Sequence, residues 1–225
     1  QTRITVQRHE KYIRDEDSPT PGSLVPEAAI KEYEDTVTRF GKMMESLDLE
    51  KQKEVDVLVI ASDTHFKDHE EWGQRCIETA QKVVEGIKIV LDEHSLPHTQ
   101  LLNEHKVESA SGPKSRFRGE RGQPRPTKNV REPKIFTESP DFVAFLKEQS
   151  GGEINQQFWV DFESDTYKAK REEMGAEGPW QMADRLAKFI DILARYSENY
   201  HKKNPGRRLI IWTASHYDLM SPYLR

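Results

Sequence analysis

The chain has a single cysteine, no long apolar run and no excess of positive charge. One thiol, Cys76, allows neither an internal disulfide nor a thiolate zinc cluster, which excludes a disulfide-stapled secreted scaffold and a zinc ribbon. A reducing, cytoplasmic location is therefore expected. No stretch approaches the roughly 18 apolar residues that a membrane helix needs, so a membrane-spanning protein is excluded and no membrane partner is expected.

The charge balance is slightly acidic. Lys and Arg total 34 against 39 Asp and Glu, a net charge of −5 that does not favour nucleic acid as a partner. Hydrophobic residues make up only 35% of the chain, but four Trp, nine Phe and seven Tyr provide large apolar side chains to bury. A chain of 225 residues with this content predicts one folded domain over residues 1–225.

Two nearly continuous apolar runs, at residues 55–61 and 208–214, predict strands that are covered on both faces. A β-branched run at residues 3–7 predicts another strand, and residues 99–102 give a weaker strand signal.

Apolar residues recur at helical spacing between these strands. The segment that begins at Pro26 has a stripe of Ile30, Tyr33, Val37, Phe40, Met44 and Leu47. Similar stripes predict helices around residues 76–90 and 179–200, and Cys76 lies on the first of these as a small core residue. Strands that alternate with helices are typical of α/β proteins, and we predict a three-layer αβα sandwich with a mainly parallel sheet.

Residues 113–134 differ from the rest of the chain in composition. They contain eight Lys or Arg, two Glu, four Pro and two Gly, with only Phe117 and Val130 as larger apolar groups. This composition predicts an irregular, basic surface insertion. It is either a solvated loop or a positively charged rim that attracts an anionic substrate or nucleic acid.

Reactive side chains follow the first and the last predicted strand. Arg8, His9 and Glu10 come after residues 3–7, and Ser215-His216-Tyr217 comes after residues 208–214. Ligands of open α/β sheets bind beyond the carboxyl ends of the strands, so two histidines at such ends predict a site there.

The residues at these strand ends resemble motifs of a known family. Arg8-His9 resembles the RHG signature of the histidine phosphatase superfamily, also called phosphoglycerate-mutase-like, and Ser215-His216 resembles its second histidine motif. Three further segments resemble family boxes in the right order: residues 75–80 (R-x-x-[EQ]-T-A), residues 102–104 (L-[NE]-E) and residues 175–177 with Arg185 (G-[GA]-E and a following arginine). Together they cover nearly the whole chain. The resemblance implies the phosphoglycerate-mutase-like fold and the branch with its acid in the L-[NE]-E box.

The resemblance implies a hydrolase that cleaves a small phosphomonoester through a phosphohistidine, without a metal or other cofactor. His9 would be the nucleophile, and Arg8, Arg75 and His216 would bind the phosphate. Guanidiniums suit this role because they clamp phosphate oxygens bidentately, and nearby cations keep an imidazole neutral enough to attack. Glu104 would donate the proton to the leaving oxygen.

Three residues depart from the family pattern at the expected rim of the pocket. Glu10 and Tyr217 replace glycines beside the two histidines, and Asp15 stands where many members carry a phosphate-contacting Asn. A non-catalytic or weakly active phosphate-binding module of the same fold is therefore an alternative. A mutase is another, because Leu102-Asn103-Glu104 is the mutase form of its box, although Leu101 and His105 do not match the basic residues that flank it in mutases.

A metal site is a rival interpretation of one segment. His65 and His69 are four residues apart and would share a helical face, with Asp63 or Glu70 as a further ligand. Polar residues on a solvated loop explain the same pattern. The sequence does not indicate an oligomeric state.

Overall fold

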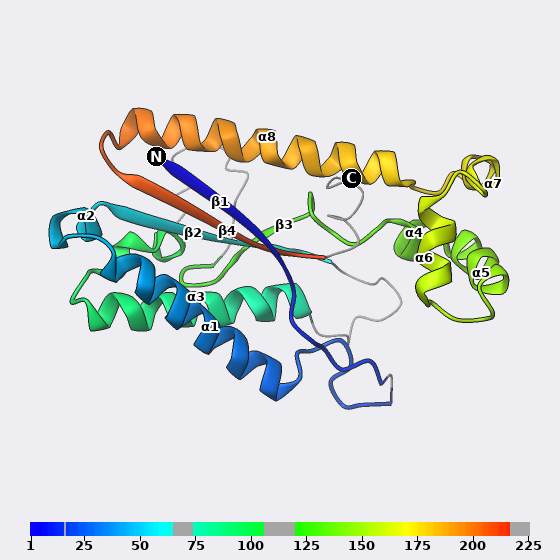
Figure 1. The fold of residues 1–225 in the computed structure, drawn as a ribbon, viewed down its shortest axis with the longest axis horizontal. Coiled ribbons are helices and arrows are strands. Elements are labelled where there is room, and N and C mark those ends of the chain that lie inside the picture. Colours follow the sequence, from blue (N-terminus) through cyan, green and yellow to red (C-terminus); the bar gives the residue numbers. More distant parts are fainter. Residues whose placement is uncertain (16, 65–73, 106–119, 217–225) are drawn as a thin grey trace.

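The computed structural model describes residues 1–15, 17–64, 74–105 and 120–216. Four parallel strands form one sheet, in the order β1-β4-β2-β3 (Figure 1). They are β1 (Thr2–Arg8), β2 (Val55–Ser62), β3 (Arg125–Thr127) and β4 (Arg208–Ser215). The predicted parallel sheet and its strands at residues 3–7, 55–61 and 208–214 are confirmed.

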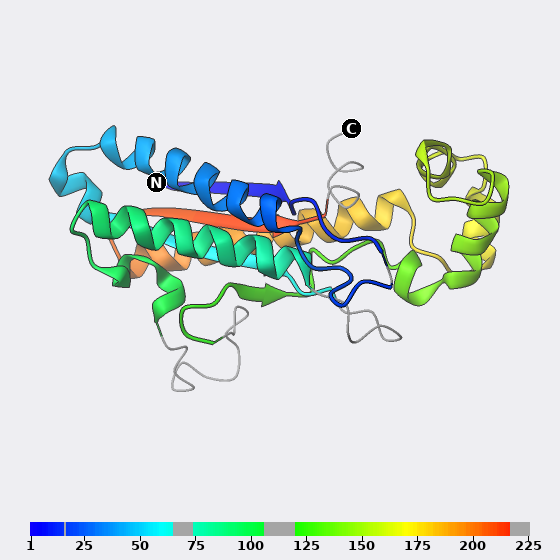
Figure 2. The same cartoon turned by 90° about the horizontal axis from the view of Figure 1, so that it is seen from below.

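Helices cover both faces of this sheet, as Figures 1 and 2 show. One face carries α1 (Pro26–Glu45) and α3 (Arg75–Glu93), and the other carries α8 (Pro179–Lys203). The shorter elements are α2 (Leu49–Lys53), η1 (His98–Gln100), η2 (Leu102–Glu104), α4 (Ile135–Glu138), α5 (Pro140–Gln149), α6 (Gln156–Glu163) and α7 (Lys168–Glu173). The α/β class with helices on both faces agrees with the predicted layers. Among the described residues, no helix has both the length and the apolar character to span a membrane.

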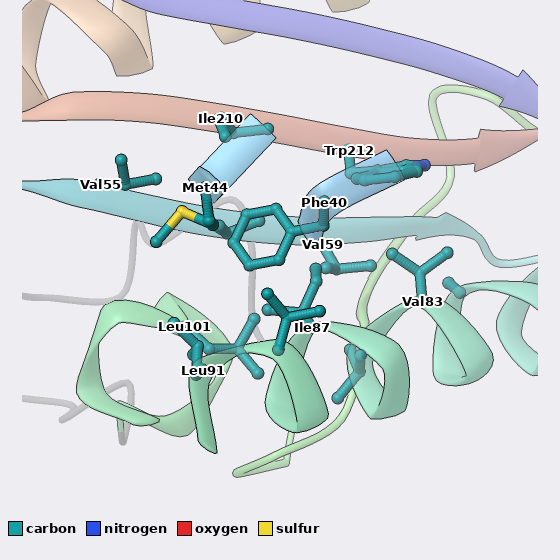
Figure 3. Packing of buried hydrophobic residues seen from close by; sticks show 14 of the residues in the cluster. Phe40, Met44, Val55, Val59, Val83, Ile87, Leu91, Leu101, Ile210 and Trp212 are labelled. Carbon is teal, nitrogen blue, oxygen red and sulfur yellow. The ribbon is translucent and has the colours of Figure 1, made fainter. Parts of the chain in front are cut away.

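Burial on both faces explains the continuous apolar runs of the central strands. In β2, Val55 and Val59 pack against α1 and α3 (Figure 3), whereas Leu58 and Ile60 belong to the core on the α8 side. Because successive side chains of a strand point to opposite faces, a strand covered twice needs apolar residues at every position.

The buried face of α1 differs from the predicted stripe. Phe40 and Met44 are in the core, but Ile30 is 58% exposed and the buried positions include Glu32 and Thr36. Polar contacts explain the rotation, because the Glu32 carboxylate accepts a hydrogen bond from Gln7 Nε2 at 2.9 Å and one from Thr36 at 3.2 Å.

The expected weak strand at residues 99–102 is wrong. These residues form 3₁₀ turns, and only Leu101 makes an isolated bridge to Val57 of β2. The amide of Asn103 takes the place of a strand: its Oδ1 accepts from Val59 N at 2.8 Å and its Nδ2 donates to Val59 O at 2.9 Å. Gln100 donates in the same way to the carbonyl of Val55 at 2.6 Å.

The basic segment is only partly an insertion. Residues 113–119 lie outside the described residues, but Arg125–Thr127 forms β3 beside β2, and Val130 is fully buried. The Arg125 side chain is also buried, and it donates to the carbonyls of Asn103 and His105 at 3.2 and 2.7 Å. The prediction of an irregular surface loop is therefore wrong for this part, because sheet pairing and buried hydrogen bonds order it.

A buried ionic cluster lies at the amino end of the sheet. Both Asp56 oxygens accept from Arg207, from Nη2 and from Nε, each at 2.5 Å. The Tyr200 hydroxyl donates to the same carboxylate, and burial raises the pKa of Tyr200. Asp56, Tyr200 and Arg207 are called the amino-end cluster below.

Candidate functional site

The structure brings the two strand-end histidines together. Arg8 of β1 pairs in register with Ser215 of β4, and the next residue, His9, donates its backbone N–H to the Ser215 carbonyl at 2.8 Å. The rings of His9 and His216 therefore lie side by side, with centroids 5.2 Å apart. Both are buried, His9 with 7% and His216 with 1% of its surface exposed.

Hydrogen bonds define the protonation state of His9. Its Nδ1 lies 2.7 Å from the carbonyl of Glu10, to which it donates, and its Nε2 accepts from Arg75 Nε at 3.1 Å. An imidazole with one donating and one accepting nitrogen is neutral. Burial lowers the pKa of His9 to about 3, and the charges of Arg75, His216 and Arg8 act in the same direction. His9 thus holds a lone pair on Nε2 at neutral pH.

Arg75 is the first residue of α3, and its guanidinium lies beside His9. It is 6% exposed, and its Cζ lies 4.2 Å from the centre of the Tyr12 ring, where the aromatic face supports the charge. The amino terminus of a 19-residue helix also favours anions. Arg75 therefore combines a guanidinium with a helix terminus at one point.

His216 is held by neighbours on two elements. Its Nε2 lies 3.0 Å from Thr64 Oγ1, just after β2, and 3.3 Å from the Cys76 sulfur on α3. Burial raises the pKa of Cys76 to about 12, so the thiol stays protonated and can donate to His216 Nε2. The remaining proton of a neutral ring then sits on Nδ1. Burial lowers the pKa of His216 well below its ordinary value, followed by the positive charges of Arg75, Arg185 and Arg8.

Glu132 is the site residue that the sequence did not reveal. It is 8% exposed, its carboxylate forms an ion pair with Arg75, and its Oε1 lies 3.2 Å from His216 Nδ1. The alignment at His216 is poor, so Nδ1 has no hydrogen-bonded partner among the described residues. Only the position of Glu132, five residues after β3, hints at a role, and β3 itself lies in a segment that was expected to be irregular.

Within the described part of the chain, the Arg8 side chain makes no hydrogen bond to His9 or His216. Its side chain is exposed and borders a surface pocket of about 390 Å³, whose lining consists of Gln7, Arg8, Glu10, Lys31, Glu32, Asp35, Thr38 and Arg39. Glu10 turns toward this pocket as well, with Oε1 3.6 Å from Lys31 Nζ, so that only its carbonyl faces the His9 ring. The Glu10 side chain therefore points away from the His9 ring, although Glu10 stands where the family pattern has a glycine.

Glu104 does not join the histidines. It pairs with Lys88 of α3 at 2.5 Å and with Arg121 at 3.4 Å, and the hydrogen bond from Lys88 is the main cause that lowers its pKa. Lys88 follows Arg75 by 13 residues in the same helix, which corresponds to about 20 Å along its axis. The carboxylate beside the histidines is that of Glu132 instead.

The segment 175–177 and Arg185, the last of the predicted motifs, hold the backbone in place and do not form a ligand site. Arg185 binds both oxygens of Glu177, from Nε at 3.1 Å and from Nη2 at 3.0 Å. The same guanidinium donates to the carbonyls of Arg131 and Glu132 at 2.9 and 3.2 Å. The 175–177 segment and Arg185 therefore fix the backbone that carries Glu132.

The remaining predicted positions lie apart or outside the described residues. Asp15 is exposed on a loop, where its carboxylate accepts from Asp17 N at 3.0 Å. Tyr217, His65, His69 and Glu70 are outside the described residues, and Asp63 pairs with Arg131. Within the described ranges, no group of three or more His, Cys, Asp or Glu side chains could hold a metal.

Comparison with known proteins adds no relative. No protein-family model matches the chain, and no curated protein matches it either.

The site itself is a buried pair of neutral imidazoles, a buried guanidinium at a helix terminus and a carboxylate, that of Glu132, between the guanidinium and one imidazole. Together these groups offer a nucleophilic nitrogen, several N–H donors for an anion and a carboxyl group for proton transfer.

Proposed function

We propose that this protein is a phosphatase of the histidine phosphatase type, with a phosphoglycerate-mutase-like fold, that hydrolyses a small phosphomonoester. One observation carries the proposal: the Nε2 lone pair of a neutral, buried His9 lies 3.1 Å from Arg75 Nε, and a second imidazole lies alongside. An attacking nitrogen and the donors for the attacked anion are thereby adjacent.

In the first step, His9 Nε2 attacks phosphorus while the bond to the leaving oxygen breaks. The Nδ1–H bond to the Glu10 carbonyl stabilises the positive charge that develops on the ring. The Arg75 guanidinium and the His216 Nδ1–H donate to the phosphoryl oxygens. Water then attacks the phosphohistidine, phosphate leaves and His9 is regenerated.

Arg8 would complete the phosphate site from the rim. It is the last residue of β1 and is exposed, and no described residue forms an ion pair with it. Its charge already lowers the pKa of both histidines. A long, unpaired side chain at this point can turn toward a bound dianion without breaking an existing ion pair.

Two observations bear on the alternatives. The Glu132 carboxylate is paired with the guanidinium that a phosphate would need, so phosphate binding, with or without turnover, requires that this ion pair be broken or shared. A mutase is disfavoured because Leu101 is fully buried in the core and the His105 ring is hydrogen-bonded to the Thr99 carbonyl at 2.7 Å. Neither residue provides the basic flank of the mutase box.

The test is turnover of para-nitrophenyl phosphate in the presence of a metal chelator. We expect release of nitrophenol that survives the chelator and disappears in His9→Ala. A Lys202→Ala variant, altered on the last turn of α8, serves as the matched control. Thermal stabilisation by phosphate without any release would instead identify a binding module.

A further inference from the structure

The donors that the proposed function assigns to phosphate are already in contact with a carboxylate. Glu132 pairs with Arg75, and its Oε1 lies 3.2 Å from His216 Nδ1. The Glu132 side chain is 9% exposed. A phosphoryl group bound by the same two side chains would have to lie in contact with this carboxylate or displace it.

The backbone of Glu132 is fixed independently of its side chain. Its N–H lies 3.3 Å from Thr64 Oγ1, and its carbonyl accepts from Arg185 at 3.2 Å. On the amino-terminal side, the Val130 carbonyl accepts from Ser215 Oγ at 3.0 Å. These bonds come from the ends of β2 and β4 and from α8. The carboxyl group can therefore rotate, but it cannot leave the site.

Charges face Glu132 from each element that packs around it. Arg75 comes from α3, His216 from the end of β4 and Arg185 from α8, while the neighbouring Arg131 is neutralised by Asp63 at 3.3 Å. Arg185 is likewise neutralised by Glu177 at 3.0 Å. Arg75 is thus the cation that Glu132 pairs with directly. A dianion that takes over Arg75 leaves Glu132 beside negative charge, and like charges favour its protonated form.

We propose that Glu132, and not Glu104, is the proton donor of the reaction, and that it becomes protonated when the phosphate group displaces it from Arg75. This inference rests on the proposed function. Glu132 takes its proton from solvent and gives it to the leaving oxygen as the phosphorus–oxygen bond breaks and the bond from His9 Nε2 forms. The regenerated carboxylate then takes a proton from the water that attacks phosphorus, and the phosphorus–nitrogen bond breaks.

The first experiment measures protons rather than turnover. Sulfate is the probe, because it is a tetrahedral dianion whose charge does not change near neutral pH. Calorimetric titrations in buffers of different ionisation heat should show an uptake of about one proton per sulfate bound. We expect this uptake to vanish in Glu132→Gln and to persist in Glu138→Gln, the matched control on the exposed side of α4.

Several outcomes of that titration would overturn the proposal. They are binding of sulfate without proton uptake, uptake that persists in Glu132→Gln, uptake that disappears in Glu104→Gln, and no sulfate binding at all. Each is separate from the failure of the proposed function, which would be turnover that is absent or independent of His9.

The second experiment compares leaving groups. Loss of a general acid slows departure of a poor leaving group more than that of a good one, by about 10² to 10⁴-fold. Glu132→Gln should therefore impair hydrolysis of alkyl phosphates much more than hydrolysis of para-nitrophenyl phosphate. An equal loss for both substrates would mean that Glu132 only shapes the site.

Discussion

Two buried ionic clusters lie at opposite ends of one sheet. They differ in how completely their polar atoms are hydrogen-bonded within the cluster. At the amino end, both oxygens of Asp56 are bound by Arg207, and Tyr200 adds a further donor. At the carboxyl end, two imidazoles are held neutral and His216 Nδ1 lacks an aligned partner among the described residues. A saturated cluster stabilises the fold, whereas a cluster in which an imidazole nitrogen has no aligned partner can receive a ligand.

Removal of Asp56 should produce the largest change in stability. Asp56→Ala leaves Arg207 and Tyr200 without their acceptor, and we expect the free energy of unfolding to fall by about 3 to 5 kcal/mol. Activity per folded molecule should not change. Urea unfolding measures the loss, with Asp191→Ala as the control for an exposed ion pair on α8. A loss as small as that of the control would contradict a stabilising role for the amino-end cluster.

Substitution at the other end should act on turnover instead. Arg75→Lys keeps a positive charge but removes the planar set of donors, and we expect kcat/KM to fall by about 10² to 10³-fold. Steady-state kinetics with para-nitrophenyl phosphate measure this, and Arg195→Lys, on the exposed face of α8, is the control. Unchanged kinetics in Arg75→Lys would remove this arginine from the phosphate site.

The two histidines at the carboxyl end should also make the stability of the protein depend on pH. The unfolded chain protonates His9 and His216 near the ordinary histidine pKa of about 6.5, whereas burial holds both pKa values lower in the folded state. The unfolded state therefore binds more protons below about pH 6.5, and stability falls as the pH decreases toward about 3.

Between about pH 6.5 and 3, His9 contributes about 1.4 kcal/mol per pH unit. We expect His9→Gln to flatten the dependence of the free energy of unfolding on pH by this amount, as measured by urea unfolding at several pH values. An identical slope in the variant and the wild type would mean that His9 is not kept neutral by burial.

The smallest effect should come from the Lys88–Glu104 pair. Lys88→Gln removes a partly exposed ion pair, and we expect a loss below about 1 kcal/mol. If Glu104 takes no part in proton transfer, the pH profile of turnover stays unchanged when its main partner is removed. A shift of the acidic limb of the pH–rate profile in Lys88→Gln would instead indicate that Glu104 is the proton donor.

The central part of this arrangement could be predicted because it follows from local pattern and sheet geometry. Continuous apolar runs at 55–61 and 208–214 specify doubly covered strands, and parallel strands end at the same edge. Histidines that directly follow β1 and β4 must then be neighbours. That inference needs no knowledge of what lies between them.

The carboxylate of the site could not be predicted in this way. β3 has three residues, one of them a proline, so its pairing with β2 depends on distant contacts and not on its own strand propensity. Glu104 was favoured because its three-residue box matched a family pattern. The position of Glu104 along the sheet is set by Asn103, whose amide pairs with Val59, three positions before β2 ends at Ser62.

The amide side chains along β2 affect where the sheet can associate with another copy of the protein. Gln100 and Asn103 occupy backbone groups on the outer side of β2, and β3 covers the rest of that border. At the opposite border, β1 pairs only with β4 among the described residues. A foreign strand is therefore more readily added at β1, a seven-residue edge, than at β3, the other edge strand, which has three residues and a proline that cannot donate a hydrogen bond.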